Sequence, residues 1–420
     1  MHRLGLGLWR EVWLVQIGIF LNTLGWGAVL PFEVIYLHDG RGFSLGAAGL
    51  VVGTLTGAAV LSAPCAGPLI DRVGARAVAA GAGAALASGY TGLALAQHER
   101  VAFAAAAIGG LGNGALLPAQ STLLAALAAP EVRHRAGAVS RVCTNAGFGL
   151  GGALGGVVAG FGLGGFVALF LFNAATYLVY VAVLIAVVRK PARPERLAGG
   201  YRHVLGDWPF LQLAVANMLI IAIGWGVLSW VVPPYARSQL GVGPQLIGLL
   251  LFANAGVVVL AQVPVAKLAE GKRRAAMMAT GAGLIAAACL LILAAGSLGG
   301  GAYAAVVLAT IVVALGECFH TAVLMPLVSD LAPLHLRGRY MATMGLSWWV
   351  GLALAPTAGT QLLATSPTIT FVGSAAAATC AGASMLALDR RLPATARFTP
   401  RPAAANRSDL RASVTGAANG

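Results

Sequence analysis

The stretch GPLIDRVGAR, Gly67–Arg76, decides how this chain is interpreted. It gathers Asp71, Arg72 and Arg76 within six residues, between two long runs of Ala, Val, Leu and Gly. Apolar runs of about 20 residues are long enough to cross a bilayer as helices. A short charged turn between two such runs therefore indicates a loop that joins two membrane helices.

The composition of the whole chain agrees with this interpretation. Its 420 residues are 59% hydrophobic and 10% charged, whereas a soluble domain carries roughly 25% charged residues. The sequence predicts an all-α integral membrane protein with twelve transmembrane helices in two pseudo-symmetric six-helix bundles. The predicted spans cover residues 12–37, 46–69, 77–97, 101–128, 137–160, 164–188, 208–235, 245–267, 275–297, 302–328, 340–363 and 367–388.

The basic residues fix the expected orientation. When the loops are assigned alternately to the two sides, 24 of the 27 Lys and Arg residues fall on one side and 3 on the other. Cytoplasmic loops carry such an excess, so we predict a multi-pass protein of a bacterial cell membrane with both termini in the cytoplasm. The net charge of +14 then serves topology and contact with anionic lipid of the bilayer, and no nucleic acid partner is expected.

The chain repeats its own layout. Gly25-Trp26-Gly27 recurs as Gly224-Trp225-Gly226, and later the basic loop with Arg133 recurs as the loop with Arg337. Two similar halves with a substrate site between them are typical of secondary transporters. We therefore predict an N-terminal bundle at 1–188, a cytoplasmic linker at 189–207, a C-terminal bundle at 208–392 and a disordered cytoplasmic tail at 393–420.

The opening stretch resembles the signature loop of the major facilitator superfamily, Gly-x-x-x-Asp-Arg-x-Gly-x-Arg, carried here by Gly67, Asp71, Arg72, Gly74 and Arg76. The resemblance extends over the whole chain. It implies a gate at the cytoplasmic side, in which Asp71 meets the start of span eleven and Arg72 or Arg76 pairs with Glu131. An ordinary solvated turn is the alternative. The other residues that this gate would include are Arg133, Arg337 and Arg339.

Two further stretches resemble motifs of the twelve-span drug/proton antiporters. LGWGAVLPF, Leu24–Phe32, resembles their first-span pattern, and NAGFGLGGALGG, Asn145–Gly156, resembles their span-five glycine motif. Small residues at such spacing let membrane helices approach closely, and plain packing is the alternative to an export function. The helix-packing positions are Gly147, Gly151, Gly155, Gly156, Gly152 (which replaces the motif's proline) and Pro356 in span eleven.

One carboxylate lies deep in a predicted span. Glu317 sits near the middle of span ten, and His320 follows three residues later on the same helix face. The usual span-four arginine of proton-coupled family members is replaced by Ile108. Charged residues at membrane depth are costly and usually functional. We therefore predict that Glu317 with His320 carries the proton or balances a cationic substrate; a Glu-His pair that only ties helices together is the alternative.

Several other residues within the spans are candidates for the substrate cavity. They are Asn22, Trp26, Glu33, Asn113, Asn217 and Trp225. An interfacial carboxylate is an equally good interpretation of Glu33. The five cysteines lie in apolar segments without metal-ligand spacing, so neither a metal nor a cofactor is expected.

We therefore predict an exporter of small amphipathic or apolar compounds that works as a monomer by proton antiport and rocker-switch alternating access. The sequence lacks a P-loop and paired catalytic motifs, so an enzyme is not expected. Proton-coupled uptake of a small metabolite and a non-transporting receptor on the same fold are the alternatives.

Overall fold

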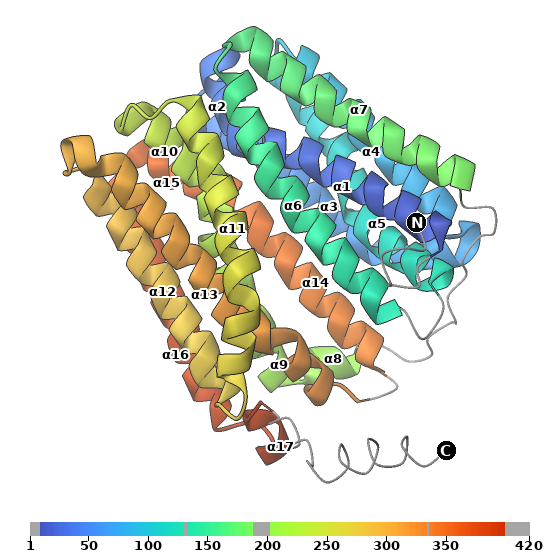
Figure 1. The fold of residues 1–420 in the computed structure, drawn as a ribbon. Helices are drawn as coiled ribbons and strands as arrows, with labels where there is room; N and C mark the ends of the chain where they lie inside the picture. The colour runs from blue at the N-terminus through green and yellow to red at the C-terminus, as the bar shows by residue number, and fades with distance from the viewer. Residues whose placement is uncertain (1–8, 129–132, 188–201, 334–335, 400–420) are drawn as a thin grey trace, which may run out of the picture.

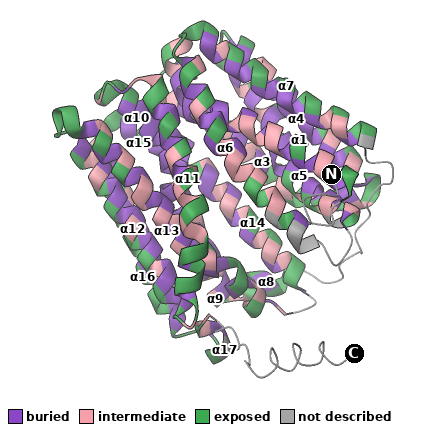
Figure 2. Ribbon diagram, viewed as in Figure 1, coloured by how far each residue is buried: buried purple, intermediate pink, exposed green. Residues whose placement is uncertain are grey.

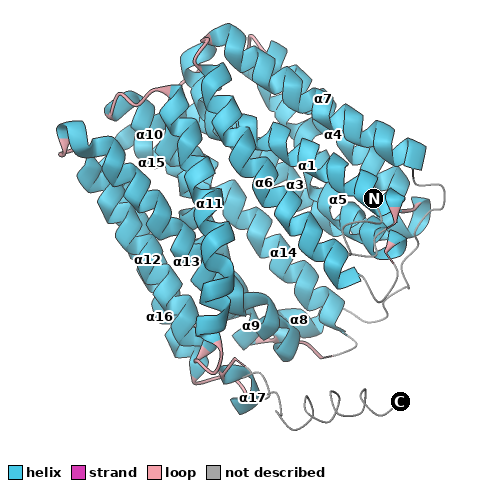
Figure 3. Cartoon of the chain, in the orientation of Figure 1, coloured by secondary structure: helices cyan, strands magenta, loops and turns pink. Residues whose placement is uncertain are grey.

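The computed structural model describes residues 9–128, 133–187, 202–333 and 336–399. Within them the chain folds into long helices joined by short loops (Figure 3). In the first half these are α1 (Arg10–Val29) with its continuation α2 (Glu33–Ile35), α3 (Leu45–Val73), α4 (Ala75–Leu95), α5 (Glu99–Leu127), α6 (Arg133–Ala159) and α7 (Leu163–Val187). The second half contains α8 (Arg202–Gly206), α9 (Trp208–Ile221), α10 (Val232–Gln239), α11 (Pro244–Ala269), α12 (Arg274–Ala295), α13 (Ala302–Leu331), α14 (Arg337–Leu354), α15 (Thr360–Thr365), α16 (Pro367–Asp389) and α17 (Ala394–Arg397).

These helices make twelve membrane crossings. Eleven continuous helical segments of the described residues are long and apolar enough to span a bilayer. The twelfth crossing is the helical run Arg337–Thr365, which includes α14 and α15. The fold class predicted from the sequence is confirmed: two six-helix bundles, α1–α7 and α9–α16, lie side by side (Figure 1).

The outer surface of the bundles is apolar, as a bilayer requires. On α7, for example, the exposed residues include Leu171, Phe172, Leu178, Val179 and Ile185. Figure 2 shows such exposed positions alternating with buried ones along the peripheral helices. Large apolar surfaces of this kind are rare on soluble monomers, and they follow from the absence of water in the surrounding hydrocarbon.

Three of the crossings change their helical winding. Residues Tyr36–Gly40, Ala222–Val231 and Ala355–Gly359 are π-helical. Prolines lie in or next to two of these stretches, since Pro233 and Pro234 follow the second and Pro356 lies in the third. A proline removes one backbone donor and displaces the preceding turn, and single π-helical turns are frequent at functional sites.

The molecule has a basic end and an opposite end. The basic end is the end at which α3 meets α4, α11 meets α12, and α1 and α14 begin. The opposite end is the one at which α4 meets α5 and α12 is followed by α13. The halves pack against each other through α6 with α11 and through α3 with the run Arg337–Thr365.

The predicted tail differs from the structure over its first residues. We expected disorder from residue 393, but Pro393 precedes the short helix α17, and Phe398 forms an antiparallel bridge with Arg273. The guanidinium carbon of Arg273 lies over the ring of Phe398, 5.9 Å from the ring centre, which gives the segment a cationic partner. Residues 400–420 and the linker residues 188–201 lie outside the described part of the chain.

Candidate functional site

Two cavities lie at the interface between the halves, and a third adjoins them within the first half. The second-half cavity, about 230 Å³, is lined by Leu30, Thr144, Asn145, Phe148, Ile220, Ile221, Trp225, Leu251, Asn254, Ala255, Val258, Glu317, His320, Thr321 and Trp348. The first-half cavity, about 210 Å³, is lined by Ile19, Asn22, Thr23, Trp26, Asn113, Leu116, Leu117, Gln120, Thr144, Phe148, Tyr177, Trp225, Trp348 and Trp349. The vestibule, about 430 Å³, is lined by Ile19, Leu117, Gln120, Ser121, Leu124, Ala136, Gly137, Ser140, Arg141 and Thr144.

Shared lining residues place the three cavities next to one another. Thr144 lines all of them, and Gln120 lines both the first-half cavity and the vestibule. The vestibule reaches Ser121 and Arg141, which are exposed toward the basic end. The cavities therefore lie in a row from the middle of the molecule to its basic end.

An aromatic cluster separates the first-half and second-half cavities. It consists of Trp26, Phe148, Trp225 and Trp348. The ring centre of Trp225 lies 5.9 Å from that of Trp26, 5.6 Å from that of Phe148 and 5.8 Å from that of Trp348. Trp26 and Trp225, which correspond in the sequence repeat, thus meet edge to face at the boundary between the halves. The cluster offers a flat apolar ligand several ring faces.

Glu317 lies on the wall of the second-half cavity. Its Oε1 atom is buried beside the side-chain amide of Asn254, but neither this oxygen nor the Asn254 Nδ2 atom forms a hydrogen bond of ordinary geometry with a described residue. A buried polar atom without a partner is costly in a folded protein and is usually satisfied by water or by a ligand. The carboxyl group is thus available to a proton or to a guest in the cavity.

His320 contacts Asn217 and not Glu317, the partner that the sequence suggested. Its Nε2 lies 2.9 Å from Oδ1 of Asn217, whose Nδ2 donates to Oγ of Ser347 over 2.8 Å. No ion pair or hydrogen bond joins His320 to Glu317 in the described structure. The chain of contacts ties α13 to α9 and α14, so His320 holds the cavity wall while Glu317 faces the cavity.

The other predicted cavity residues divide into two groups. Asn22, Trp26 and Asn113 line the first-half cavity, and Trp225 lines both central cavities. Asn113, which the repeat places opposite Glu317, occupies the corresponding place as a neutral amide. Asn217 lies one layer behind the wall, and Glu33 lines none of the three cavities. Sequence reasoning missed Phe148, although a single large residue within a glycine-rich run is a signal that could have identified it.

The predicted helix-packing glycines lie on two faces of α6. Gly147, Gly151 and Gly155 pack against α1, within the first half. Gly152 and Gly156 face α11, where a Cβ on Gly156 would lie 2.9 Å from the carbonyl oxygen of Pro244. On the other side of the interface, Gly49 of α3 meets the carbonyl oxygen of Pro356. Small residues thus bring the backbones of the two halves into contact.

The predicted gate loop at the basic end lies apart from the second half. Gly74 is the single residue between α3 and α4 and has a φ of +89°, a conformation that favours glycine. Arg76 donates to the carbonyl oxygen of Ile185 over 2.8 Å, and no described residue lies within 4 Å of a Cβ built on Gly67. Asp71 and Arg72 form no hydrogen bond or ion pair with a described residue.

The expected contact of Asp71 with the start of α14 is therefore not formed in this structure. The helix N-cap there is Leu336, without a side-chain cap, and Arg337 donates to the carbonyl oxygen of Ser329. The physical reason is that the close backbone contacts between the halves, such as Gly156 with Pro244 and Gly49 with Pro356, lie toward the opposite end. Glu131 and the side chain of Arg133 lie outside the described residues, and Arg339 lies in the first turn of α14.

The second half contains an ion pair between a buried arginine and an exposed aspartate that sequence reasoning missed. Nη2 of Arg274, at the start of α12, lies 2.7 Å from Oδ2 of Asp330, near the end of α13. The Arg274 side chain is 1% exposed and that of Asp330 is 46% exposed. This pair joins the start of α12 to the end of α13. It corresponds to the contact that we expected Arg72 or Arg76 to form with Glu131 in the first half.

Asp330→Asn is expected to lower the free energy of unfolding by about 1–3 kcal/mol, because it leaves a buried guanidinium without its charged partner. Thermal unfolding in detergent would measure the loss. The matched control is Asp71→Asn, which removes a carboxylate without such a pair and should leave the unfolding temperature unchanged. Equal unfolding temperatures for wild type and Asp330→Asn would contradict a stabilising role of the pair.

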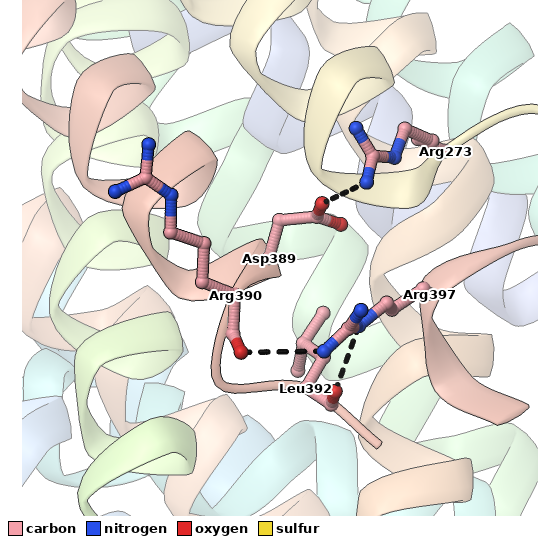
Figure 4. Close-up of polar contacts among 5 residues, drawn as sticks. All are labelled: Arg273, Asp389, Arg390, Leu392 and Arg397. Carbon is pink, nitrogen blue, oxygen red and sulfur yellow. Dashed lines mark hydrogen bonds and ion pairs between the residues drawn. The ribbon is translucent and has the colours of Figure 1, made fainter. Parts of the chain in front are cut away.

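A second ion pair lies nearby at the basic end (Figure 4). Nη2 of Arg273 lies 3.1 Å from Oδ2 of Asp389, at the end of α16. Arg397 donates from Nε to the carbonyl oxygen of Leu392 over 2.9 Å, and from Nη2 to that of Arg390. The Arg397 hydrogen bonds hold the first tail residues against the end of α16. The ion pair of Arg273 with Asp389 joins the end of α16 to the α11–α12 turn.

Comparison with known proteins places the chain in a family. The family model for the Major Facilitator Superfamily matches residues 15–231 and 214–417. The MFS-type transporter YttB of Bacillus subtilis strain 168, named as uncharacterized, is 31% identical over 262 residues, which are 60% of this chain and 64% of that protein. The MFS-type transporter YqjV of the same organism, also named as uncharacterized, is 24% identical over 84% of this chain and 87% of that protein.

Solved structures with the same fold have low sequence identity to this chain. The peptide transporter POT in complex with sulfate superimposes with a TM-score of 0.75 at 18% identity, over 91% of this chain and 94% of that one. A bacterial homolog of the human lysosomal transporter Spinster, in an inward-facing and occupied conformation, gives 0.74 at 14% identity over 93% and 98%. The family resemblance seen in the sequence is thereby confirmed. The chain belongs to the major facilitator superfamily, a family of membrane transporters and not of enzymes.

Proposed function

We propose that this chain is a secondary active transporter that exports small amphipathic or apolar compounds in exchange for protons. The observation that carries the proposal is the position of Glu317, whose carboxyl group faces a largely apolar cavity between the halves and has an unpaired Oε1 among the described residues. A carboxyl group in such a place can bind either a proton or a cationic group of a substrate. Movement of the halves would then expose it to the two sides of the membrane in turn.

The cavity lining supports the proposed substrate class. Glu317 is the carboxylate of the two central cavities, and the other polar groups there are amides, hydroxyls and the imidazole of His320. Aromatic rings and aliphatic side chains make up the remaining surface. A strongly charged metabolite would need several charged partners, so an amphipathic or apolar compound fits this lining better.

The resemblance of the span-five glycines to the antiporter motif supports the direction. The excess of Lys and Arg at the basic end favours its location in the cytoplasm. Of these glycines, Gly152 and Gly156 pack the first half against α11 of the second half. Because the sequence has no P-loop, a proton gradient is the proposed energy source, with the protein acting as a monomer in the cell membrane.

A compound panel in a bacterial host without its own major efflux pumps tests the proposal. Cells with the wild-type chain should accumulate less of at least one amphipathic compound than cells with the empty vector, and dissipation of the proton gradient should abolish the difference. Higher accumulation in the presence of the chain would establish uptake and contradict export. No change across the panel, with the chain verified in the membrane, would contradict export of this compound class.

A further inference from the structure

Glu33 is a buried carboxylate that the cavities do not use. It follows Pro31 in the first crossing, near the opposite end, and is 2% exposed. Its Oε1 accepts a hydrogen bond from the Tyr90 hydroxyl over 3.0 Å, and its Oε2 accepts one from Nε1 of Trp230 over 2.9 Å. Both oxygens therefore face donors. A carboxylate held in this way is well satisfied, although it lies at membrane depth.

The two donors belong to different halves. Tyr90 lies on α4 of the first half, as Glu33 itself does on α2, whereas Trp230 lies in the π-helical stretch of the second half. Trp230 is itself 2% exposed, so both partners of this bond lie away from solvent. The repeat offset of the sequence relates Trp230 to Pro31 and Glu33 to Val232. The bond thus joins nearly equivalent positions of the two halves.

Two other polar contacts join described residues of the halves at this end, and both are exposed. Asp39 and Arg237 form an ion pair at 3.7 Å, with side chains 43% and 44% exposed. Gln361 donates to the carbonyl oxygen of Gly46 over 3.0 Å at an exposed position. Exposed ion pairs contribute little because water and salt screen them. A buried hydrogen bond to a charged acceptor is stronger, and breaking it leaves both groups unsatisfied.

We propose that Glu33 is the latch of the opposite end, which holds that end closed through its bond with Trp230. When the halves separate there, Trp230 leaves with the second half while Tyr90 keeps its bond to Glu33 within the first half. Opening breaks this bond. It is then possible only when water takes over as the partner of the Glu33 carboxylate and as the partner of the Trp230 indole nitrogen. The inference rests on the alternating movement in the proposed function and adds a residue on which that movement depends.

Distance measurements between spin labels test the latch without any substrate. Labels would be placed at His98 and Ser297, which are exposed in opposite-end loops of the two halves, in a variant whose five cysteines are replaced by serine. Trp230→Phe removes only the crossing donor and keeps an aromatic ring. Glu33→Gln keeps one acceptor oxygen but turns an amide NH₂ toward the other donor. Two matched controls are Tyr90→Phe, which removes the bond within the first half, and Asp39→Asn, which removes the exposed ion pair.

Trp230→Phe and Glu33→Gln are expected to raise the ratio of open to closed molecules roughly tenfold or more, the change that loss of a hydrogen bond to a charged group implies. Tyr90→Phe and Asp39→Asn should change it less than about twofold. Unchanged distances in Trp230→Phe and Glu33→Gln would overturn the latch, as would equal opening in Tyr90→Phe. The two proposals can fail separately. If Trp230→Phe opens the opposite end but the wild type exports no compound, the proposed function is contradicted and the latch is supported.

Discussion

Replacement of Gly248 by leucine is expected to abolish transport while the protein still folds. Gly248 of α11 lies against α6, where a Cβ would come within 2.8 Å of the Cα atom of Gly156 and closer still to the carbonyl oxygen of Gly152. These neighbours are backbone atoms, so they cannot rotate away as a side chain could. The halves would have to separate at the opposite end, and the close packing of α6 with α11 would be lost.

The measurement for Gly248→Leu is the accumulation of a compound that the wild type exports, together with the distance between the His98 and Ser297 labels. Accumulation should rise to the level of the empty vector, and the distance should lengthen. The matched control is Gly256→Leu on the same helix, because no described residue lies within 4 Å of a Cβ built at Gly256. Full export by Gly248→Leu would show that close contact of α6 with α11 is not needed.

The second large effect is expected for Glu317→Gln, which should abolish export driven by a proton gradient. Glutamine has nearly the same shape as glutamate, so the second-half cavity should keep its form, but its amide cannot take up and release a proton. In reconstituted vesicles we expect net transport against a gradient to fall to the background level. Exchange of labelled for unlabelled compound, which needs no net proton movement, should persist.

The control for Glu317→Gln is Glu270→Gln, which removes an exposed carboxylate of the same half outside the cavities. It should transport like the wild type. Gradient-driven transport by Glu317→Gln at the wild-type rate would show that this carboxyl group does not couple transport to protons. Loss of exchange as well would indicate that Glu317 binds the compound, as the counter-charge of a cationic substrate would.

The fold could be predicted because each of its signals is local. A run of apolar residues such as Leu163–Val187 determines a crossing by its length alone. The glycines of the span-five pattern could also be related to close helix packing, since small residues allow it wherever they lie. The sequence did not show that Gly147 faces α1 whereas Gly152 faces α11, because a single sequence does not say which helix lies on which side.

The candidate site was only partly predictable, because its contacts join residues far apart in the sequence. The bond from Trp230 to Glu33 and the ion pair of Arg274 with Asp330 leave no mark in the spacing of residues. His320 was placed correctly on its helix, but its partner Asn217 comes from α9. The predicted contact of Asp71 with α14 is not formed in this structure, because spacing in the sequence does not determine how far apart the two halves lie.

Proton movement coupled to transport tests the account most directly. Everted membrane vesicles that contain the chain and a pH-sensitive dye would be acidified inside, and a compound identified in the panel would then be added. The account predicts that the compound releases protons from vesicles with wild-type chain, and that vesicles with Glu317→Gln show no release beyond those without the chain. Transport of the compound by the wild type without proton movement, or equal release with Glu317→Gln, would contradict it.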